Sequence, residues 1–161
     1  MTAALSLRVF TGAAAGTMSA ARTGIDMISA DNDTNSLGNR QAHPVPVGTR
    51  SFEKYVALRV DTAPDNACAN FKIWGDGAVA ANTSFLFGVT ATPATPVSTA
   101  SSVATTDFTT VTSGAKADWD TGSYATVGDL TQYAVFQLSA GGTASPGNWG
   151  AEVIYYSFDE S

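Results

Sequence analysis

The sequence predicts an all-β protein made of one antiparallel β-sandwich domain, with the jelly roll as one form that this sandwich could take. Three observations lead to this prediction. Several short stretches alternate apolar and polar side chains, which is typical of strands with one buried face. Gly, Pro, Asn and Asp residues separate these stretches, as turns require. No stretch of helical length has a 3.6-residue apolar period, so we expect about seven strands and little helix.

The clearest alternation lies in the first half of the chain. Over residues 50–61, Phe52, Val56, Leu58 and Val60 share one register that only Lys54 interrupts, and the other register is mostly polar. Residues 63–66, Ala-Pro-Asp-Asn, are a turn signal, because Pro presets φ and Asx side chains bond the nearby backbone. The alternation resumes over residues 69–74. We therefore expect a half-buried strand, a reversing loop and a second strand.

The sequence before this region divides into two parts. Residues 1–21 hold a candidate strand at 5–10 followed by an Ala/Gly-rich arm or loop, and residues 22–161 form the predicted sandwich domain. Arg8 lies inside the apolar segment and nothing basic precedes it, so we do not expect a secretion signal. No apolar run approaches the roughly 20 residues that span a bilayer. A short, imperfect strand is expected at residues 24–30.

The segment after it imitates the opening of a calcium-binding loop through the spacing of Asp31, Asp33 and Asn35. The imitation fails at Ser36, where the loop needs Gly, and at Ala42, where it needs a bidentate Glu. We interpret the segment as an Asx-rich turn. Two prolines at alternate positions follow within residues 43–48, and they predict an extended backbone that leads directly into the next strand.

The second half of the chain is again strand and turn. Gly88 marks a bulge or a close backbone approach within its strand, and residues 121–123 indicate a turn. Residues 92–114 are rich in Ser and Thr, yet recurring Val and Phe predict an ordered surface excursion rather than a disordered linker. Further strands are expected at residues 84–91, 109–112, 133–139 and 149–158. The last one is apolar in both registers, which is typical of a central strand covered twice or of a strand covered by another subunit.

Composition and motifs argue against several functions. Eight basic and fourteen acidic side chains give a net charge of −6, which disfavours direct binding to nucleic acid. Cys68 is the single cysteine and His43 the single histidine, and no Gly-x-Ser-x-Gly motif is present. No catalytic residue, metal ligand or cofactor site is predicted, and we expect a protein that is not an enzyme. Two carboxylates suffice for glycoside hydrolysis, and fourteen acids leave that chemistry open.

Aromatic side chains are the remaining candidates for a functional surface. They could form an interface with a partner protein or a platform for sugar rings, although large rings more often lie in a core or at subunit contacts. The four candidates are Trp74, Trp119, Trp149 and Tyr155.

Read together, several segments resemble small structural proteins of tailed bacteriophages. The similar segments are residues 37–40, 44–55, 70–77 and 92–96 with the Ser/Thr run after them, and the tyrosine-rich end at 155–160. The resemblance covers about residues 24–161 and carries over no site residues. It implies a capsid decoration or cement protein located on the virion, with the major capsid protein or other virion proteins as partners. Capsid positions impose rotational symmetry, so we also expect a homo-oligomer, with a trimer favoured. The alternative is a carbohydrate-binding module of the same fold that attaches to glycans or to a host surface.

Overall fold

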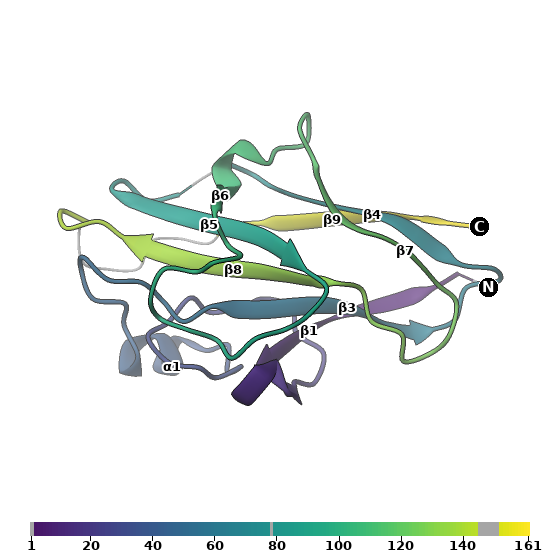
Figure 1. The fold of residues 1–161 in the computed structure, drawn as a ribbon, viewed down its shortest axis with the longest axis horizontal. Coiled ribbons are helices and arrows are strands. Elements are labelled where there is room, and N and C mark those ends of the chain that lie inside the picture. The colour runs from purple at the N-terminus through teal and green to yellow at the C-terminus, as the bar shows by residue number, and fades with distance from the viewer. Residues whose placement is uncertain (1, 78, 145–151) are drawn as a thin grey trace.

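The structure is a computed structural model that describes residues 2–77, 79–144 and 152–161. Two antiparallel sheets pack face to face and confirm the predicted all-β sandwich (Figure 1). The strands of the described residues are β1 (Ala4–Thr11), β2 (Thr17–Met18), β3 (Lys54–Thr62), β4 (Cys68–Gly75), β5 (Thr83–Thr90), β6 (Thr106–Asp107), β7 (Ala117–Tyr124), β8 (Tyr133–Ala140) and β9 (Ile154–Glu160). The six-stranded sheet has the order β2-β1-β3-β8-β5-β6, and the three-stranded sheet has the order β7-β4-β9. The sandwich therefore has unequal sheets.

Within residues 2–77, 79–144 and 152–161, helical structure is limited to three short elements: α1 (Leu37–Ala42) and the 3₁₀ turns η1 (Ala13–Ala15) and η2 (Phe108–Thr110). The N-cap of α1 is Ser36, whose Oγ accepts a hydrogen bond from the Asn39 N–H. Asp26 accepts from the Ser36 N–H and pairs with Arg40, so the Asx-rich segment serves to start and hold this helix.

β3 is the centre of the larger sheet, and both of its faces are buried. It pairs with β1 on one side and with β8 on the other. Val56 and Leu58 face the core between the sheets, while Tyr55 and Ala57 belong to a second cluster on the opposite face. That cluster includes Ala104 of the 92–114 excursion. The expectation of a half-buried strand is therefore wrong, because the excursion folds back over the outer face of the sheet.

The excursion is ordered, as predicted, and contacts with β8 and β5 help to hold it in place. The Gln137 side chain, fully buried on β8, donates to the carbonyl oxygens of Val97 and Thr99. At Gly88 of β5, a Cβ atom would lie 2.0 Å from the carbonyl oxygen of Val103, so the close backbone approach is confirmed. The strand expected at residues 109–112 is wrong, since η2 lies there and the short strand β6 precedes it.

The expected positions of four strands are confirmed, because residues 5–10, 69–74 and 133–139 fall within β1, β4 and β8, and residues 84–91 overlap β5 except at Ala91. The first of these pairs along its length with β3, so residues 1–21 contribute a full strand to the larger sheet. β9 occupies the later part of the expected strand at 149–158, and the earlier part, residues 149–151, lies outside the described residues.

The loop at residues 63–66 joins two strands, as expected, and it carries the chain from β3 in one sheet to β4 in the other, because both edges of β3 are already paired. Two local expectations are wrong. Residues 24–30 form no strand, and their carbonyl and amide groups bond the chain at Phe52 and His43 instead. β7 runs through the turn expected at 121–123, with a shift of its register against β4.

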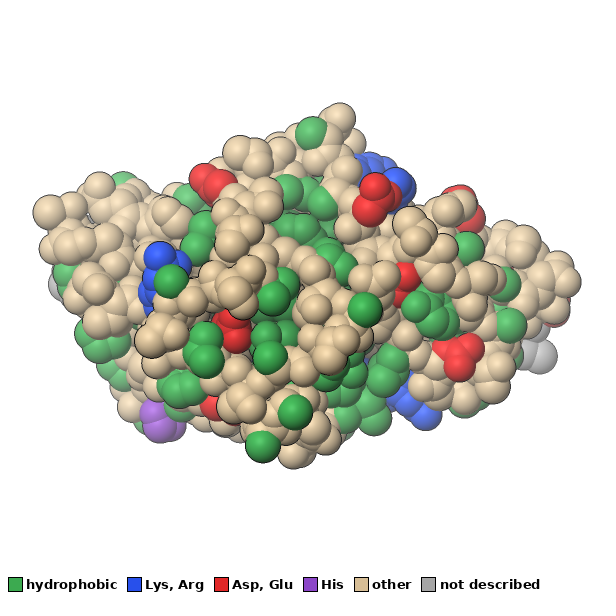
Figure 2. Space-filling view, in the orientation of Figure 1, with side chains coloured by type: hydrophobic (Ala, Val, Ile, Leu, Met, Phe, Trp, Pro, Cys, Tyr) green, Lys and Arg blue, Asp and Glu red, His purple; other side chains and the backbone are tan. Residues whose placement is uncertain are grey.

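The chain ends lie together at one end of the sandwich, and α1 lies below the strands toward the other end (Figure 1). On the face shown in Figure 2, charged side chains are few and scattered, and hydrophobic atoms are visible between uncharged polar ones. This surface follows from a chain in which only 14% of the residues are charged.

Candidate functional site

The tryptophans predicted as surface candidates have different positions. Trp119 on β7 is only 2% exposed, and its indole N–H donates to the Gln132 carbonyl oxygen at 2.9 Å. Its ring packs in the core between the sheets, so Trp119 is not available for a surface platform on this chain. Trp149 lies outside the described residues.

Trp74 and Tyr155 form a cross-strand aromatic pair. They are direct partners in the register of β4 and β9, and their rings stack with centroids 5.7 Å apart and planes 14° from parallel. Lys116 precedes β7, on the other side of β4, and its Nζ lies 4.1 Å from the centroid of the Trp74 ring. We call Lys116, Trp74 and Tyr155 the aromatic ladder.

The contacts within the aromatic ladder limit access to the faces of the Trp74 ring. Because β7 and β9 flank β4 on opposite sides, Lys116 and Tyr155 approach Trp74 from opposite sides and cover both faces of its ring. Tyr155 is 45% exposed and lies on the edge strand of the smaller sheet. Of the three candidates within the described residues, Tyr155 is thus the ring most open to a partner.

An apolar groove of about 1390 Å³ opens between the two sheets beside β9. Leu5 and Leu7 of β1 line one side, and Ile154 and Tyr156 of β9 line the other. Deeper lining residues come from the core faces of both sheets, namely Val56, Ile73, Phe85, Trp119 and Phe136. The groove therefore reaches the core of the sandwich. No sequence pattern pointed to it, because its two walls come from opposite ends of the chain.

Exposed hydrophobic side chains gather around this groove. Among the described residues, nine large hydrophobic side chains are exposed, and five of them line the groove. These five, which we call the apolar rim, are Leu37, Val47, Val79, Val153 and Tyr156. Scattered apolar side chains are ordinary on a protein surface, whereas a contiguous group usually marks a binding surface.

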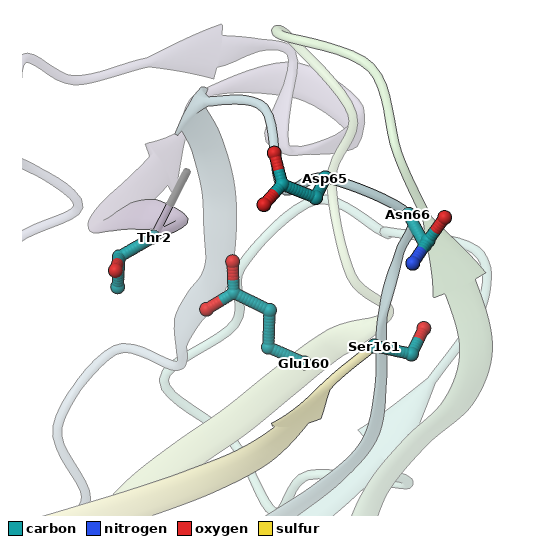
Figure 3. A pocket seen from close by; sticks show the side chains of 5 residues that line it. All are labelled: Thr2, Asp65, Asn66, Glu160 and Ser161. Atoms are coloured by element: carbon teal, nitrogen blue, oxygen red, sulfur yellow. The ribbon is translucent and has the colours of Figure 1, made fainter.

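The groove does not continue to the end of the sandwich where the chain termini lie. There the Ala3 N–H donates to the Glu160 carboxylate at 2.8 Å, so the start of β1 meets the end of β9. Residues 67 and 161 are also joined by a pair of backbone hydrogen bonds. A shallow polar hollow of about 420 Å³ marks this end, and Figure 3 shows the five side chains that line it. The open part of the groove lies toward α1, whose Leu37 and Arg40 contribute to its lining.

Lys54 is a buried charge with a structural role. It is 1% exposed, and its Nζ donates to the carbonyl oxygens of Ala30 and Asn32 at 3.0 and 2.7 Å. Burial lowers its pKa to about 8, although the nearby carboxylates of Asp31 and Asp26 oppose this shift. The side chain ties the loop before α1 to the central strand, which explains why a lysine stands in an apolar register.

Glu152 is a second group with a shifted pKa, and it lines the groove. Burial raises its pKa to about 7, and the neighbouring Asp76 carboxyl adds to the shift. The Gly77 N–H donates to Glu152 Oε1 at 3.3 Å. A neutral carboxyl beside a second carboxyl is an arrangement that acid–base catalysis uses, and the sequence offered no signal for this pair beyond the Gly-Asp-Gly turn.

The other candidate chemical groups have ordinary surroundings. His43 is the C-cap of α1. Cys68 is buried at the start of β4, and burial raises the pKa of its thiol, which makes it less reactive. In the part of the chain that the structure describes, no group of three or more His, Cys, Asp or Glu residues could hold a metal ion. No helix within those same residues is long and apolar enough to cross a membrane.

Comparisons with known proteins found no match to this chain among protein-family models, curated proteins or solved structures. They neither support nor contradict the resemblance to bacteriophage structural proteins.

Proposed function

We propose that this chain is a non-enzymatic structural protein of a bacteriophage virion, a decoration or cement protein that binds the assembled shell and stabilises it. The observation that carries the proposal is the apolar rim, whose five exposed side chains surround a groove that reaches the core. The resemblance of residues 24–161 to small phage structural proteins supports the same assignment. The partner would be the major capsid protein or another virion protein.

The rim has the chemistry of a protein contact surface. Its side chains come from α1, from the turn at Val47, from the segment between β4 and β5, and from β9 and the residue before it, and all of them line one groove. Apolar and aromatic anchors on a rigid support dominate the energy of protein interfaces, while the surrounding polar residues mainly exclude water. Binding at such a surface would join neighbouring shell subunits and would resist their separation.

The proposed assembly on the shell is a homotrimer, because lattice positions with rotational symmetry favour closed rings. Sedimentation of the purified chain at micromolar concentration measures this directly. A monomer at all concentrations, both free and bound to shells, would contradict the trimer.

The function is tested on particles from the phage whose genome encodes this chain. Mass spectrometry should find the chain in purified particles at a fixed ratio to the major capsid protein. Particles made without it should release their DNA at a lower temperature, and purified protein added back should restore the original release temperature. Purified particles that never contain the chain would overturn the proposal.

Carbohydrate binding is the second candidate, and the open ring of Tyr155 beside Trp74 is the observation that favours it. Against it, Lys116 and Tyr155 cover the Trp74 ring, and Trp119 is buried. Saturable binding on a glycan array that is lost in Tyr155→Ala would establish this alternative, and an array without binding would reject it.

A further inference from the structure

Three of the four edge strands of the two sheets have a feature that hinders pairing with another chain, and β9 lacks such a feature. An edge strand leaves backbone N–H and C=O groups unpaired, and proteins protect such edges by keeping them short or by adding charges. The edge strands of the larger sheet, β2 and β6, have two residues each. β7 carries Asp118 and Asp120. β9 has seven residues, and its first five, residues 154–158, carry no charge.

The free edge of β9 lies directly above the apolar groove. Among the described residues β9 pairs only with β4, which leaves its other edge without a neighbouring strand. Ile154 and Tyr156 face the groove, and Tyr155 faces outward in the aromatic ladder. Strands that are apolar in both registers normally have a neighbour on each side and cover on each face. β9 therefore has the sequence of an inner strand in the position of an edge strand.

We propose that β9 accepts an extended segment of a neighbouring protein chain as an added strand of the smaller sheet. The backbone of this segment would pair with residues 154–158, and every second side chain would enter the groove beside Ile154 and Tyr156. In this recognition mode main-chain hydrogen bonds supply affinity, and pockets for alternate side chains supply specificity. The inference rests on the proposed function and specifies how the shell partner would be held.

The shape of the groove favours a single strand over a folded domain as the occupant. The contact between Ala3 and Glu160 closes one end, and α1 together with Val47 stands beside the open part. β9 is about 23 Å long at about 3.3 Å per residue, which matches an extended segment of the same number of residues. Leu37 of α1 and Val47 line the same groove as β9, so the occupant of the groove contacts more than the strand itself.

Charge complementarity defines the flanks of the segment. Residues 117–161 contain six carboxylates and no Lys or Arg. Asp159 and Glu160 end β9, and the carboxyl pair of Glu152 and Asp76 lies at its start, so acids stand at both ends of an uncharged centre. The cations on the opposite side, Arg22 and Arg40, are each paired with an aspartate. The occupant is therefore an extended segment with alternating apolar side chains at its centre and Lys or Arg at both ends.

The probe is a synthetic peptide of about ten residues in which valine and threonine alternate between flanking lysines. A control peptide replaces one central threonine and the valine after it by prolines, which removes a backbone donor from each edge of the strand and keeps the other apolar side chains. Titration calorimetry measures the affinity of the full chain for each peptide, and hydrogen exchange measures protection of the amides of residues 154–158. We expect saturable 1:1 binding of the first peptide, new protection confined to β9 and its neighbours, and binding of the proline peptide that is weaker by at least about tenfold.

Two matched variants test the position. Val153→Lys places a charge at the start of β9, and Val127→Lys makes the same change at an exposed valine outside the groove lining. Both variants change the net charge equally, so a difference in their affinity for the peptide shows where the peptide binds. We expect Val153→Lys to lower the affinity for the first peptide at least about fivefold, and Val127→Lys to change this affinity less than about twofold.

Several results would overturn the inference: no peptide binding, no gain of protection at residues 154–158, equal binding of the proline peptide, or equal weakening by the two variants. A chain that dimerises through β9 without peptide, as shown by loss of the dimer in Val153→Lys, would make a second copy the occupant and would also overturn it. These results are independent of virion content. Particles that contain the chain while the peptide fails would leave the proposed function standing without this mode of attachment.

Discussion

Gly88→Ala should destabilise the protein strongly, because a methyl group has no space at this position. The added Cβ would lie 2.0 Å from the carbonyl oxygen of Val103, 2.6 Å from its carbonyl carbon and 3.2 Å from the Ala104 nitrogen. Favourable contacts between non-bonded heavy atoms begin near about 3.5 Å, so the chain at residues 103–104 would have to move by more than about 1 Å. These neighbours are backbone atoms, which cannot move aside as a flexible side chain can.

The expected cost follows from what this movement disrupts. Ala104 is buried in the cluster with Tyr55 and Val135 that covers the outer face of the larger sheet. Overpacking of this kind typically costs about 1–3 kcal/mol, and we expect a value near the upper end because two backbone segments are involved. For a chain of 161 residues, about 3 kcal/mol corresponds to a fall in Tm of about 6–12 °C.

Urea unfolding followed by circular dichroism measures this loss, and the matched control is Gly38→Ala. Gly38 lies in α1, and a Cβ at that position meets no atom within 4 Å. The same substitution there should be neutral or should stabilise by up to about 0.5 kcal/mol, because alanine favours helix. A Gly88→Ala protein whose Tm lies within about 2 °C of the wild-type value would refute the reasoning, since it would show that residues 103–104 move at little cost.

Three further predictions concern buried groups. Trp119→Ala should lower the free energy of unfolding by about 3–5 kcal/mol, because a buried ring and its hydrogen bond are lost, whereas Trp74→Ala should lower it by about 1 kcal/mol. Urea titration measures both values, and equal losses would contradict the positions assigned to the two rings. Glu152 binds its proton more tightly in the folded chain, so its contribution to stability should be lost as the pH rises from 4.5 to about 7. Over this range the free energy of unfolding of the wild type should fall by roughly 1 kcal/mol more than that of Glu152→Gln. Parallel pH profiles of the two proteins would contradict the raised pKa. Lys54 loses its proton more easily in the folded chain, so wild type should gain stability relative to Lys54→Met as the pH rises from about 8 to about 9.5. A difference in the free energy of unfolding that does not change with pH would contradict the lowered pKa.

The sequence located several strands because alternation is a local property. The side chains of a strand point to opposite faces in turn, so β1, β4, β5 and β8 could be recognised from their own residues. The same local reasoning identified Gly88 as a bulge or a close backbone approach, of which the structure shows the second, and the 92–114 segment as ordered. It failed at residues 24–30, where alternating side chains belong to an irregular segment that bonds loops instead of a neighbouring strand.

Pairing and burial depended on contacts between residues far apart in the chain. β3 and β4 follow each other closely but join different sheets, because β1 and β8, which come from opposite ends of the sequence, occupy both edges of β3. The burial of the outer face of β3 required the excursion to return over it. No local pattern encodes which distant segment arrives at a given edge or face.

The candidate site shows the same division. The sequence singled out four aromatic residues, and the structure sends Trp119 into the core while it leaves Tyr155 at an edge beside Trp74. The groove was invisible in the sequence, because Leu7 and Tyr156 on its two sides are separated by almost the whole chain. The apolar character of both faces of β9 was a property of the sequence alone. Only the tertiary structure showed that this strand lies at an edge, since the order of strands in a sheet depends on how the whole chain packs.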